Sequence, residues 1–472
     1  MCKIEIPLKQ HTPLIHFQHY QDGAMLRASE LKPKLDKFLI RKLSLTEKKM
    51  INGKNEEVAK IEHASWFNNK EKLSLDYKVK ITYDGISIKD YIEQPKLKNK
   101  NQNNGKFKTK TDKNGIESTE TYTYPLFFGN LGTDYYKTET IKKFVFIPNK
   151  ITLSISSFNK NILDSIEKYF SEFIALENFG SRQDKGFGSF YLDDNYDKYL
   201  PINETNFDYK FQLTSSGKDI WEKAKKLFYN LELFYRALRS GINLKDYDRN
   251  DKFYFKSLLF LYFKDKGIQW EKKTIKEEFF KDNAKKHNGS LLYQGLNTQK
   301  TNRSTSEALH FASENKKLVK DLLGLSNREK WSYYYNSITK TEAKYDAHGN
   351  KIKKDKKEDQ IERFKSPIFF KIIKSNTNKY TVYIKLNEDI PIKGKWFMIE
   401  NDSSKKPFPL QVPEDFSLYE FFAFIKDKTK FDITTFVESK FQKDANGNST
   451  SEYEILKNIF DGLTKINASA LI

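Results

Sequence analysis

The stretch NFGSRQDKGFGSF, residues 178–190, places three glycines and two cations within nine residues, Gly180 to Gly188. Glycine adopts positive φ without steric cost, and it lets the backbone approach another group closely. Exposed N–H groups in such a turn can surround an anion, and Arg182 and Lys185 can add charge-assisted hydrogen bonds to a phosphate. The stretch therefore predicts a turn that contacts a polyanion, whereas a plain helix-to-strand connection would need only one glycine.

Two familiar phosphate-binding motifs do not fit this stretch. A P-loop requires Lys followed by Ser or Thr, and Phe187 and Gly188 occupy those positions here. The spacing of the glycines also differs from the GxGxxG of a dinucleotide site. A long polyanion such as a nucleic acid is therefore the ligand that the stretch favours.

Regular elements flank this stretch and predict an α+β fold. Apolar residues at helical spacing predict an amphipathic helix over 160–177, and a short strand follows the stretch at 189–192. Upstream, the pattern predicts strands at 3–8, 79–88 (with a turn at Asp84-Gly85) and 144–156, and a helix at 28–43 with Ser29 as its N-cap. The order of strand, helix, strand pair, strand, helix, loop and strand is a ferredoxin-like plan, related to the RNA-recognition fold.

The second half repeats this order loosely. A strand at 208–213 precedes a long helix at 217–239, which Ser215 or Ser216 would cap and Gly241 would end. Residues 252–330 are expected to be mostly helical, over 255–263, 272–286 and 305–323. Residues 366–374 and 380–386 are expected to form a β-hairpin, and 415–427 and 451–466 to be helices.

Two domains are the expectation for a chain of 472 residues. The pattern breaks near 193–206, at several aspartates and Pro201, so we expect domains 1–200 and 201–472, the second with a helical insertion at 252–330.

Two segments are poor in apolar residues. Within residues 94–123, the stretch from Gln94 to Gly115 contains seven lysines and one aspartate. This segment and 343–360 are expected to be mobile loops, because they hold too few apolar residues to form a core.

The composition favours a nucleic-acid partner. There are 83 Lys and Arg against 63 Asp and Glu, a formal net charge of +20, which attracts phosphates. Aromatic residues make up 15% of the chain, and exposed ones could stack on unpaired bases, although most are expected in the core. The alternative interpretation of the same composition is a chain that is rich in Lys, Asn, Ile, Phe and Tyr and has no nucleic-acid partner.

The cysteine count and the hydropathy pattern exclude other classes of protein. The single cysteine, Cys2, excludes an internal disulfide framework and a cysteine-based zinc site. No run of about 18 apolar residues is present, and the N-terminus lacks the apolar core of a signal peptide. We therefore expect a cytoplasmic protein with no membrane partner.

Three histidines, His11, His16 and His19, lie close together before the first predicted helix. Their spacing on an irregular loop is poor evidence for a metal site. An acid–base role, in which a histidine acts with Tyr20 or Lys185 on an RNA 2′-hydroxyl, is an alternative. The helix that follows has cations that either track a phosphate backbone or form a solvated face: Arg27, Lys32, Lys34, Lys37 and Arg41.

Four segments of the sequence resemble RAMP-superfamily CRISPR proteins. TPLIHFQ (12–18) with GAMLRASELKPKLDKFLIR (23–41) resembles their opening strand, loop and helix, and FGSRQDKGFGSF (179–190) resembles their glycine-rich loop. DLLGLSNREKWSY (321–333) and ERFKSPIFFKIIKS (362–375) are similar to segments in the first RAMP subunit of Cmr-type (type III) effector complexes. The chain departs from the family pattern at Pro33, where a glycine is usual, and at IHFQ, which replaces a glycine-containing element.

The resemblance implies a non-catalytic RNA-binding subunit with two ferredoxin-like RAMP domains, RRM-related, with helical and loop insertions. Its partners would be crRNA, target RNA and other RAMP or Cas subunits, with no cofactor and no metal, in antiviral defence. The candidate RNA-binding residues are Arg27, Ser29, Lys32, Lys34, Arg41, Gly180, Arg182, Lys185, Gly186, Phe187 and Gly188.

Two other interpretations stay open at this point. The first is a metal-independent RAMP endoribonuclease that processes precursor crRNA, with His16 and His19 as acid–base groups. The second is a basic interaction protein without the RAMP fold.

Overall fold

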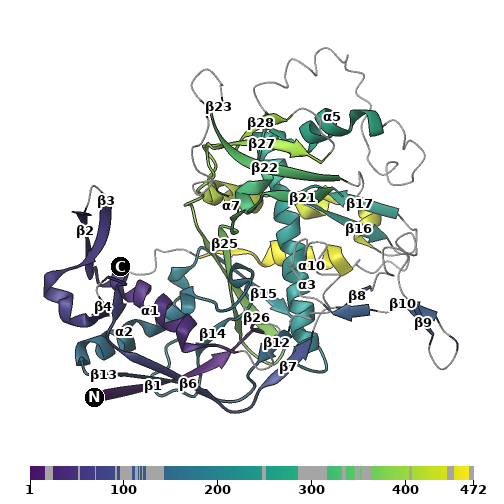
Figure 1. The fold of residues 1–472 in the computed structure, drawn as a ribbon. Helices are drawn as coiled ribbons and strands as arrows, with labels where there is room; N and C mark the ends of the chain where they lie inside the picture. Colours follow the sequence, from purple (N-terminus) through teal and green to yellow (C-terminus); the bar gives the residue numbers. More distant parts are fainter. Residues whose placement is uncertain are drawn as a thin grey trace. The chain divides into compact units, whose positions relative to one another are not determined.

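The computed structural model shows a mixed α+β protein (Figure 1). It describes all residues except 16–24, 52–53, 70, 91–92, 96–108, 112–114, 116, 120, 124–142, 247–250, 285–315, 332–335, 346–350, 353–360, 362, 403–406, 444–450 and 467–472. In the described part of the chain, every helix is too short or too polar to cross a membrane.

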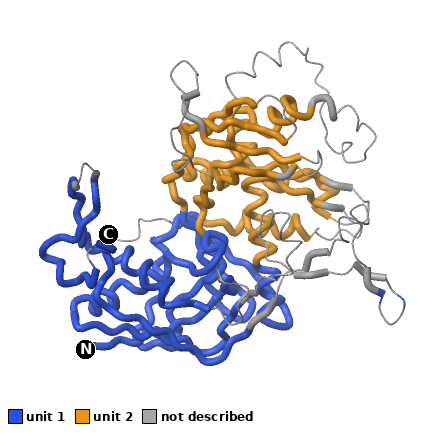
Figure 2. Tube along the Cα trace, in the orientation of Figure 1, with its two compact units in different colours: residues 1–227, 370–385, 465–472 blue, residues 228–369, 386–464 orange. Residues whose placement is uncertain are grey.

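Two compact units divide the chain (Figure 2). Unit 1 consists of residues 1–227, 370–385 and 465–472, and unit 2 of residues 228–369 and 386–464. Neither unit is one continuous stretch of sequence. The segment 193–206, where the sequence pattern breaks, lies inside unit 1.

A four-stranded antiparallel sheet and two helices form the N-terminal part of unit 1. The spatial order of its strands is β14-β1-β13-β6, from β1 (Cys2–Gln10), β6 (Lys78–Tyr83), β13 (Ile151–Ser157) and β14 (Phe190–Leu192). Helix α2 (Lys160–Leu176) packs on β1, β13 and β14, and α1 (Ala28–Lys42) contacts α2 and β6. Alternate residues of β13 are fully buried, as expected of a strand with one face on the core.

A second four-stranded sheet has the order β25-β26-β15-β29, from β15 (Tyr209–Thr214), β25 (Ile368–Lys374), β26 (Lys379–Leu386) and β29 (Thr464–Lys465). Strands β25 and β26 form the predicted hairpin, closed by the bond from Ser375 N–H to Lys379 O. Helix α3 (Ile220–Arg239) follows the first of these strands, and α10 (Ser451–Gly462) precedes the last.

Both sheets have the same strand order when their strands are counted along the chain. In each sheet the fourth strand lies beside the first, then the third, then the second. In each half a helix also connects the first strand to the second, and helical structure connects the third to the fourth. The mixed α+β class predicted from the sequence is therefore confirmed.

Unit 2 contains a larger sheet of order β18-β19-β28-β27-β22-β21, with β23 paired to β22. Its core includes the fully buried Ile338, Phe397 and Ile399. The elements of unit 2 are β16 (Ile242–Asp246), β17 (Asp251–Phe255), α4 (Leu258–Asp265), β18 (Gln269–Trp270), α5 (Glu271–Ala284), β19 (Lys316–Lys317), η5 (Lys320–Leu323), β20 (Leu325–Ser326), β21 (Arg328–Trp331), β22 (Asn336–Tyr345), β23 (Lys351–Ile352), β24 (Arg363–Phe364), β27 (Trp396–Asn401), β28 (Phe408–Gln411), α7 (Leu418–Lys426), α8 (Ile433–Phe436) and α9 (Ser439–Gln442), together with α10.

Shorter elements complete unit 1. They are β2 (Thr46–Ile51), β3 (Lys54–Ala59), η1 (Ile61–Trp66), β4 (Phe67–Asn69), β5 (Ser74–Leu75), β7 (Ser87–Asp90), β8 (Glu93–Pro95), β9 (Thr109–Thr111), β10 (Glu117–Thr119), β11 (Thr121–Thr123), β12 (Lys143–Phe146), η2 (Gln183–Lys185) and η3 (Glu204–Asn206). The small pairs are β2 with β3, β4 with β5, β7 with β12, β8 with β11 and β9 with β10.

Several predicted elements are wrong in type or extent. Residues 255–263 are not one helix, because β17 ends at Phe255 before α4 begins, and the apolar run fits either structure. The insertion 252–330 is only partly helical, since its described end contains β19, β20 and β21. The strand predicted at 144–156 is two strands, β12 and β13. Most of the helix expected at 305–323 lies outside the described residues.

The two segments expected to be loops contain strands. Residues 94–123 include β9, β10 and β11, and 343–360 include the end of β22 and all of β23. Backbone pairing stabilises these short strands, which an argument from apolar content does not detect. The remainder of both segments lies outside the described residues.

The predicted N-caps of α1 and α3 are also wrong, although both helices exist. Arg27 occupies the cap position of α1 without a side-chain cap bond, so Ser29 lies in the first turn. Asp219 caps α3 by accepting two N–H groups of the first turn, at 2.8 Å each. Helix α3 ends at Arg239, two residues before Gly241, as predicted.

Candidate nucleic-acid interface

The glycine loop, residues 178–190, lies against the start of α1. The Gly180 N–H donates to Glu30 Oε1 at 2.6 Å. Lys34 Nζ donates to Asn178 O and to Gln183 Oε1, both at 2.7 Å. The structure therefore brings together the two segments that carry the candidate RNA-binding residues.

The three glycines of this loop are required by packing inside the protein. A Cβ on Gly188, whose φ is +65°, would lie 2.0 Å from Phe179 O, and a Cβ on Gly180 would lie 2.5 Å from Ile15 O. A Cβ on Gly186 would lie 2.4 Å from Ile372 Cδ1 of β25. The close approach that the sequence indicated exists, but the neighbouring groups belong to this chain.

The prediction that consecutive N–H groups of the loop are exposed to bind an anion is wrong for at least seven of them, and four of these donate outside the loop. Gly180 N–H donates to the Glu30 carboxylate, and Ser181 N–H donates to Ile15 O at 2.6 Å. Gly188 N–H donates to Pro13 O at 2.8 Å, and Ser189 N–H to the Thr12 hydroxyl at 2.9 Å. These bonds hold the loop in one conformation.

Phe187 belongs to the core, with 1% of its surface exposed. Phe179 and Phe190, at the two ends of the loop, are fully buried and meet edge to face at 5.9 Å between ring centroids. The phenylalanines of the loop therefore anchor it, and none of them presents a ring to a base in this structure.

Lys32 and Lys34 make internal contacts on α1. Lys32 Nζ lies 2.7 Å from Asp36 Oδ2 and 4.3 Å from the centre of the Tyr77 ring. Lys34 Nζ lies 3.1 Å from Glu177 Oε2, in addition to its two bonds to the glycine loop. Both lysines tie α1 to its neighbours.

Lys371 of β25 supports the glycine loop from the other side, and the sequence reasoning missed it as a site residue. It is fully buried, and its Nζ donates to Ile174 O, Glu177 O and Phe190 O at 2.7, 2.7 and 2.8 Å. Burial lowers the pKa of Lys371 well below its ordinary value. A lone lysine inside the apolar run IFFKII is the sequence signal that could have indicated a buried, hydrogen-bonded cation.

The remaining candidates lie nearer the surface. Arg27, Ser29 and Arg41 are exposed on α1, and Arg182 is half-buried in the turn of the loop. Arg182 has φ +62°, a left-handed conformation that is uncommon outside glycine. Lys185 is half-buried, and its Nζ is below the surface.

The N-terminal histidines are only partly within the described residues. His11 is 5% exposed, and burial together with the charges of Lys371 and Lys9 lowers its pKa to about 3. His16 and His19, the acid–base groups of the ribonuclease interpretation, lie outside the described residues, as does Tyr20. Among the described residues, no group of three or more His, Cys, Asp or Glu side chains could hold a metal ion.

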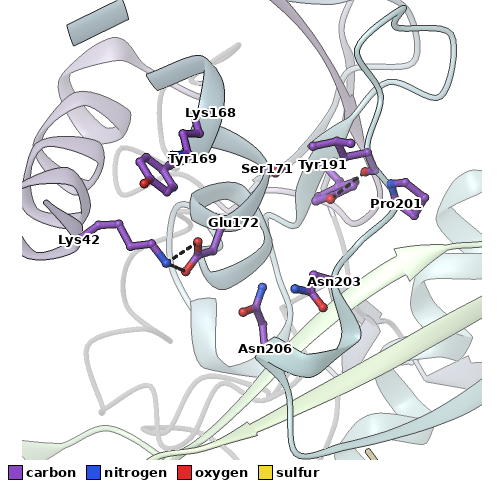
Figure 3. Close-up of a pocket in the computed structure, with 10 residues that line it drawn as sticks. Lys42, Lys168, Tyr169, Ser171, Glu172, Tyr191, Pro201, Asn203 and Asn206 are labelled. Carbon is purple, nitrogen blue, oxygen red and sulfur yellow. Dashed lines mark hydrogen bonds and ion pairs between the residues drawn. The ribbon is translucent and has the colours of Figure 1, made fainter. Parts of the chain in front are cut away.

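Two cavities of unit 1 adjoin the segment 193–206. The larger, about 500 Å³, is lined by side chains of α1, α2 and that segment (Figure 3). In it, Lys42 pairs with Glu172 at 2.7 Å and lies 5.5 Å from the Tyr169 ring centre. The smaller, about 290 Å³, includes His11, Tyr199 and Lys374 in its lining.

Comparison with known families identifies the chain. The model of the Cmr1 N-terminal domain matches residues 1–242, and that of the Cmr1 C-terminal domain matches residues 254–457. No curated protein matches the chain. The matches make it a RAMP protein of type III CRISPR effector complexes. In particular, the chain belongs to the Cmr1 family.

This membership confirms the resemblance seen in the four sequence segments. It also excludes the interpretation of the chain as a basic protein unrelated to RAMP proteins.

Proposed function

We propose that this protein is a non-catalytic RNA-binding subunit of a cytoplasmic type III effector, contacting crRNA, target RNA or both in antiviral defence. The observation that carries the proposal is the glycine loop, which internal bonds hold against the start of α1. Arg27 and Arg182 lie at the surface of these two adjoining segments. Arginine forms bidentate hydrogen bonds to phosphate, so this surface suits an RNA backbone.

The candidate residues divide into two roles in this proposal. Arg27, Ser29, Arg41 and Arg182 would contact RNA. Beneath them, the other candidates would fix the loop and the helix: Lys32, Lys34, Gly180, Lys185, Gly186, Phe187 and Gly188. This role needs charge and fixed geometry and no proton transfer, so we assign the protein no catalytic residue.

The sheet topology supports the proposed architecture. A strand order of fourth, first, third and second, with helical connections after the first and third strands, is that of a ferredoxin-like domain. We propose that each half of the chain contains one such RAMP domain. Other RAMP and Cas subunits would be its protein partners.

The proposal is tested by removing the two arginines at the surface of the loop and helix. Arg182→Asn suits the left-handed conformation, and Arg27→Ser adds a helix cap, so the double variant should fold. If each arginine neutralises one phosphate, the double variant binds single-stranded RNA more weakly. The slope of log K against log salt then becomes shallower by about 1.4.

A matched control is Lys150→Ser with Lys160→Asn, two exposed lysines outside the glycine loop and α1. This control removes the same net charge and should change the slope much less. An unchanged slope in the arginine double variant, measured by filter binding over a salt series, would contradict the proposed interface.

A further inference from the structure

We propose that the smaller cavity of unit 1 holds one unpaired nucleotide of the bound RNA. An oxygen of the nucleotide accepts from His11 Nε2, its phosphate pairs with Lys374, and its base stacks on Tyr199. This inference rests on the proposed RNA-binding function and adds a defined ligand site to it.

The cavity has the dimensions of a small-ligand site. Its volume is about 290 Å³, and its lining comes from β1, β14, the segment 193–206 and the hairpin β25–β26, all within unit 1. A volume near the lower end of the range for ligand pockets suits one small molecule and excludes a duplex.

His11 supplies an unused hydrogen-bond donor to this cavity. Its Nδ1 accepts the backbone N–H of Lys374 at 3.0 Å, so the neutral ring carries its proton on Nε2. Nε2 is buried and has no partner among the residues that the structure describes. A buried donor without an acceptor is costly, and a ligand oxygen at this position would satisfy it.

Lys374 supplies the positive charge. Its ammonium group has no ion pair in the described part of the chain, whereas the neighbouring Lys9 pairs with Asp194 at 2.7 Å. Partial burial and the charges of Lys223 and Lys9 lower the pKa of Lys374. An anion beside Lys374 would relieve this repulsion, and phosphate is the anion that an RNA ligand supplies.

Tyr199 supplies a surface for a base. Its side chain is 37% exposed, and its ring meets that of Tyr191 at 88° with 6.3 Å between centroids, which fixes its orientation. Bases splayed out of a strand commonly stack on such rings. The larger cavity is a weaker candidate, because its Lys42 already pairs with Glu172 (Figure 3).

Two carboxylates limit the ligand to a single phosphate. Asp194 and Glu204 also line the cavity. Asp194 pairs with Lys9, and Glu204 accepts from Lys210 and from the Tyr383 hydroxyl at 3.1 Å. Like charges repel, so these two carboxylates disfavour the additional negative charge of a nucleoside triphosphate.

The test is calorimetric titration of the full chain with UMP, AMP and inorganic phosphate, beside a 12-nucleotide single-stranded RNA. His11→Asn retains an acceptor for the Lys374 N–H while it removes the Nε2 donor. His11→Asn and Lys374→Met should each weaken mononucleotide binding about tenfold. Tyr199→Ala should reduce nucleotide affinity to that of phosphate, and Lys160→Met, a matched loss of charge outside the cavity, should change nothing.

Each contrary outcome is distinct. If the RNA binds through the arginines but mononucleotides do not bind, or bind equally to His11→Asn and Lys374→Met, the cavity proposal is overturned and the proposed function stands. If wild-type protein binds phosphate as tightly as UMP and AMP, the cavity is a simple anion site and the proposal is also overturned. If mononucleotides bind in a His11-dependent way and RNA does not bind, the proposed function fails, and with it the claim that the occupant belongs to RNA. Thermal unfolding shows whether each variant folds. If His11→Asn does not fold, Lys374→Met still tests the proposal.

Discussion

At the scale of single residues, burial gives polar side chains roles that their sequence positions do not reveal. Lys371 and His11 are both buried polar groups of unit 1, and both bond to the backbone of a distant segment. Carbonyl oxygens accept the hydrogen bonds of the Lys371 ammonium group, whereas the Nε2–H of His11 has no acceptor among the residues that the structure describes. The first arrangement stabilises the fold, and the second suits a ligand.

His11 makes the stability of the protein sensitive to acid. Its pKa is ordinarily 6.5 and is lowered to about 3 in the folded protein, by burial first and then by Lys371 and Lys9, with Asp194 opposing. Between these values the unfolded chain binds a proton that the folded protein does not. The contribution of neutral His11 to the free energy of unfolding is therefore fully present above pH 6.5. As the pH falls from 6.5 toward 3, this contribution is lost at about 1.4 kcal/mol per pH unit.

The measurement is urea unfolding of wild-type protein and His11→Asn at pH 7, 5.5 and 4.5. Carboxylates affect both proteins alike, so the difference in their free energies of unfolding isolates His11. We expect this difference to move in favour of the variant as pH falls. A difference that stays constant from pH 7 to 4.5 would show that His11 titrates normally in the folded state.

At the scale of elements, the glycine loop is a rigid connection with contacts on three sides: the segment 12–15, the start of α1 and β25. Its glycines stabilise the loop in two ways. They adopt positive φ, and they leave room for another part of the chain that a Cβ would overlap. The steric and the conformational contributions to stability can be measured separately.

Gly188→Ala and Gly85→Ala separate the two effects. Both glycines have positive φ, +65° and +72°, but the nearest atom to a Cβ on Gly85 is the end of the Asn149 side chain, at 3.2 Å. Gly85→Ala should cost about 1–2 kcal/mol for conformation alone. Gly188→Ala, with Phe179 O at 2.0 Å from the new atom, should cost more than about 3 kcal/mol.

Urea unfolding of both variants checks this comparison, since both sites belong to unit 1. Equal losses of stability would mean that the loop shifts to accommodate a methyl group. The packing role assigned to Gly188 would then be incorrect.

The elements of the first half could be predicted because their apolar spacing is regular, as in the alternate buried residues of β13. The larger sheet of unit 2 was missed in part because some of its strands, such as β18 and β19 with two residues each, are too short to show an alternating pattern. In the candidate site, the link between the glycine loop and α1 followed from the family resemblance. The burial of Phe187 and the role of Lys371 depend on a contact with β25, which no local pattern reveals.

At the scale of the whole molecule, unit 1 is incomplete without residues from far along the chain. Residues 370–385 supply Lys371, and Ile372 packs directly against Gly186. A fragment that ends near residue 206 contains the first sheet with α1 and α2, yet it lacks this contact. In this fragment Phe190 O would lose its bond from Lys371, and the Asn178 side-chain amide would lose its bond to Phe370 O.

We therefore expect fragment 1–206 to aggregate or to melt well below the full chain, because it exposes apolar surface and leaves carbonyl oxygens of the glycine loop without a donor. Size-exclusion chromatography and thermal unfolding provide the measurement. Co-expression with 207–472 should restore a soluble complex. A monomeric fragment that melts with the full chain would show that the hairpin β25–β26 is dispensable.

The discontinuity of unit 1 also has a consequence for its synthesis on the ribosome. Strand β14 ends at Leu192, but the hairpin that covers the glycine loop ends at Leu386. At 5–20 residues per second, the nascent N-terminal half waits roughly 10–40 s for this hairpin to emerge. During that interval its unfinished surface is open to chaperones, and a translational pause between these two points would lengthen the exposure.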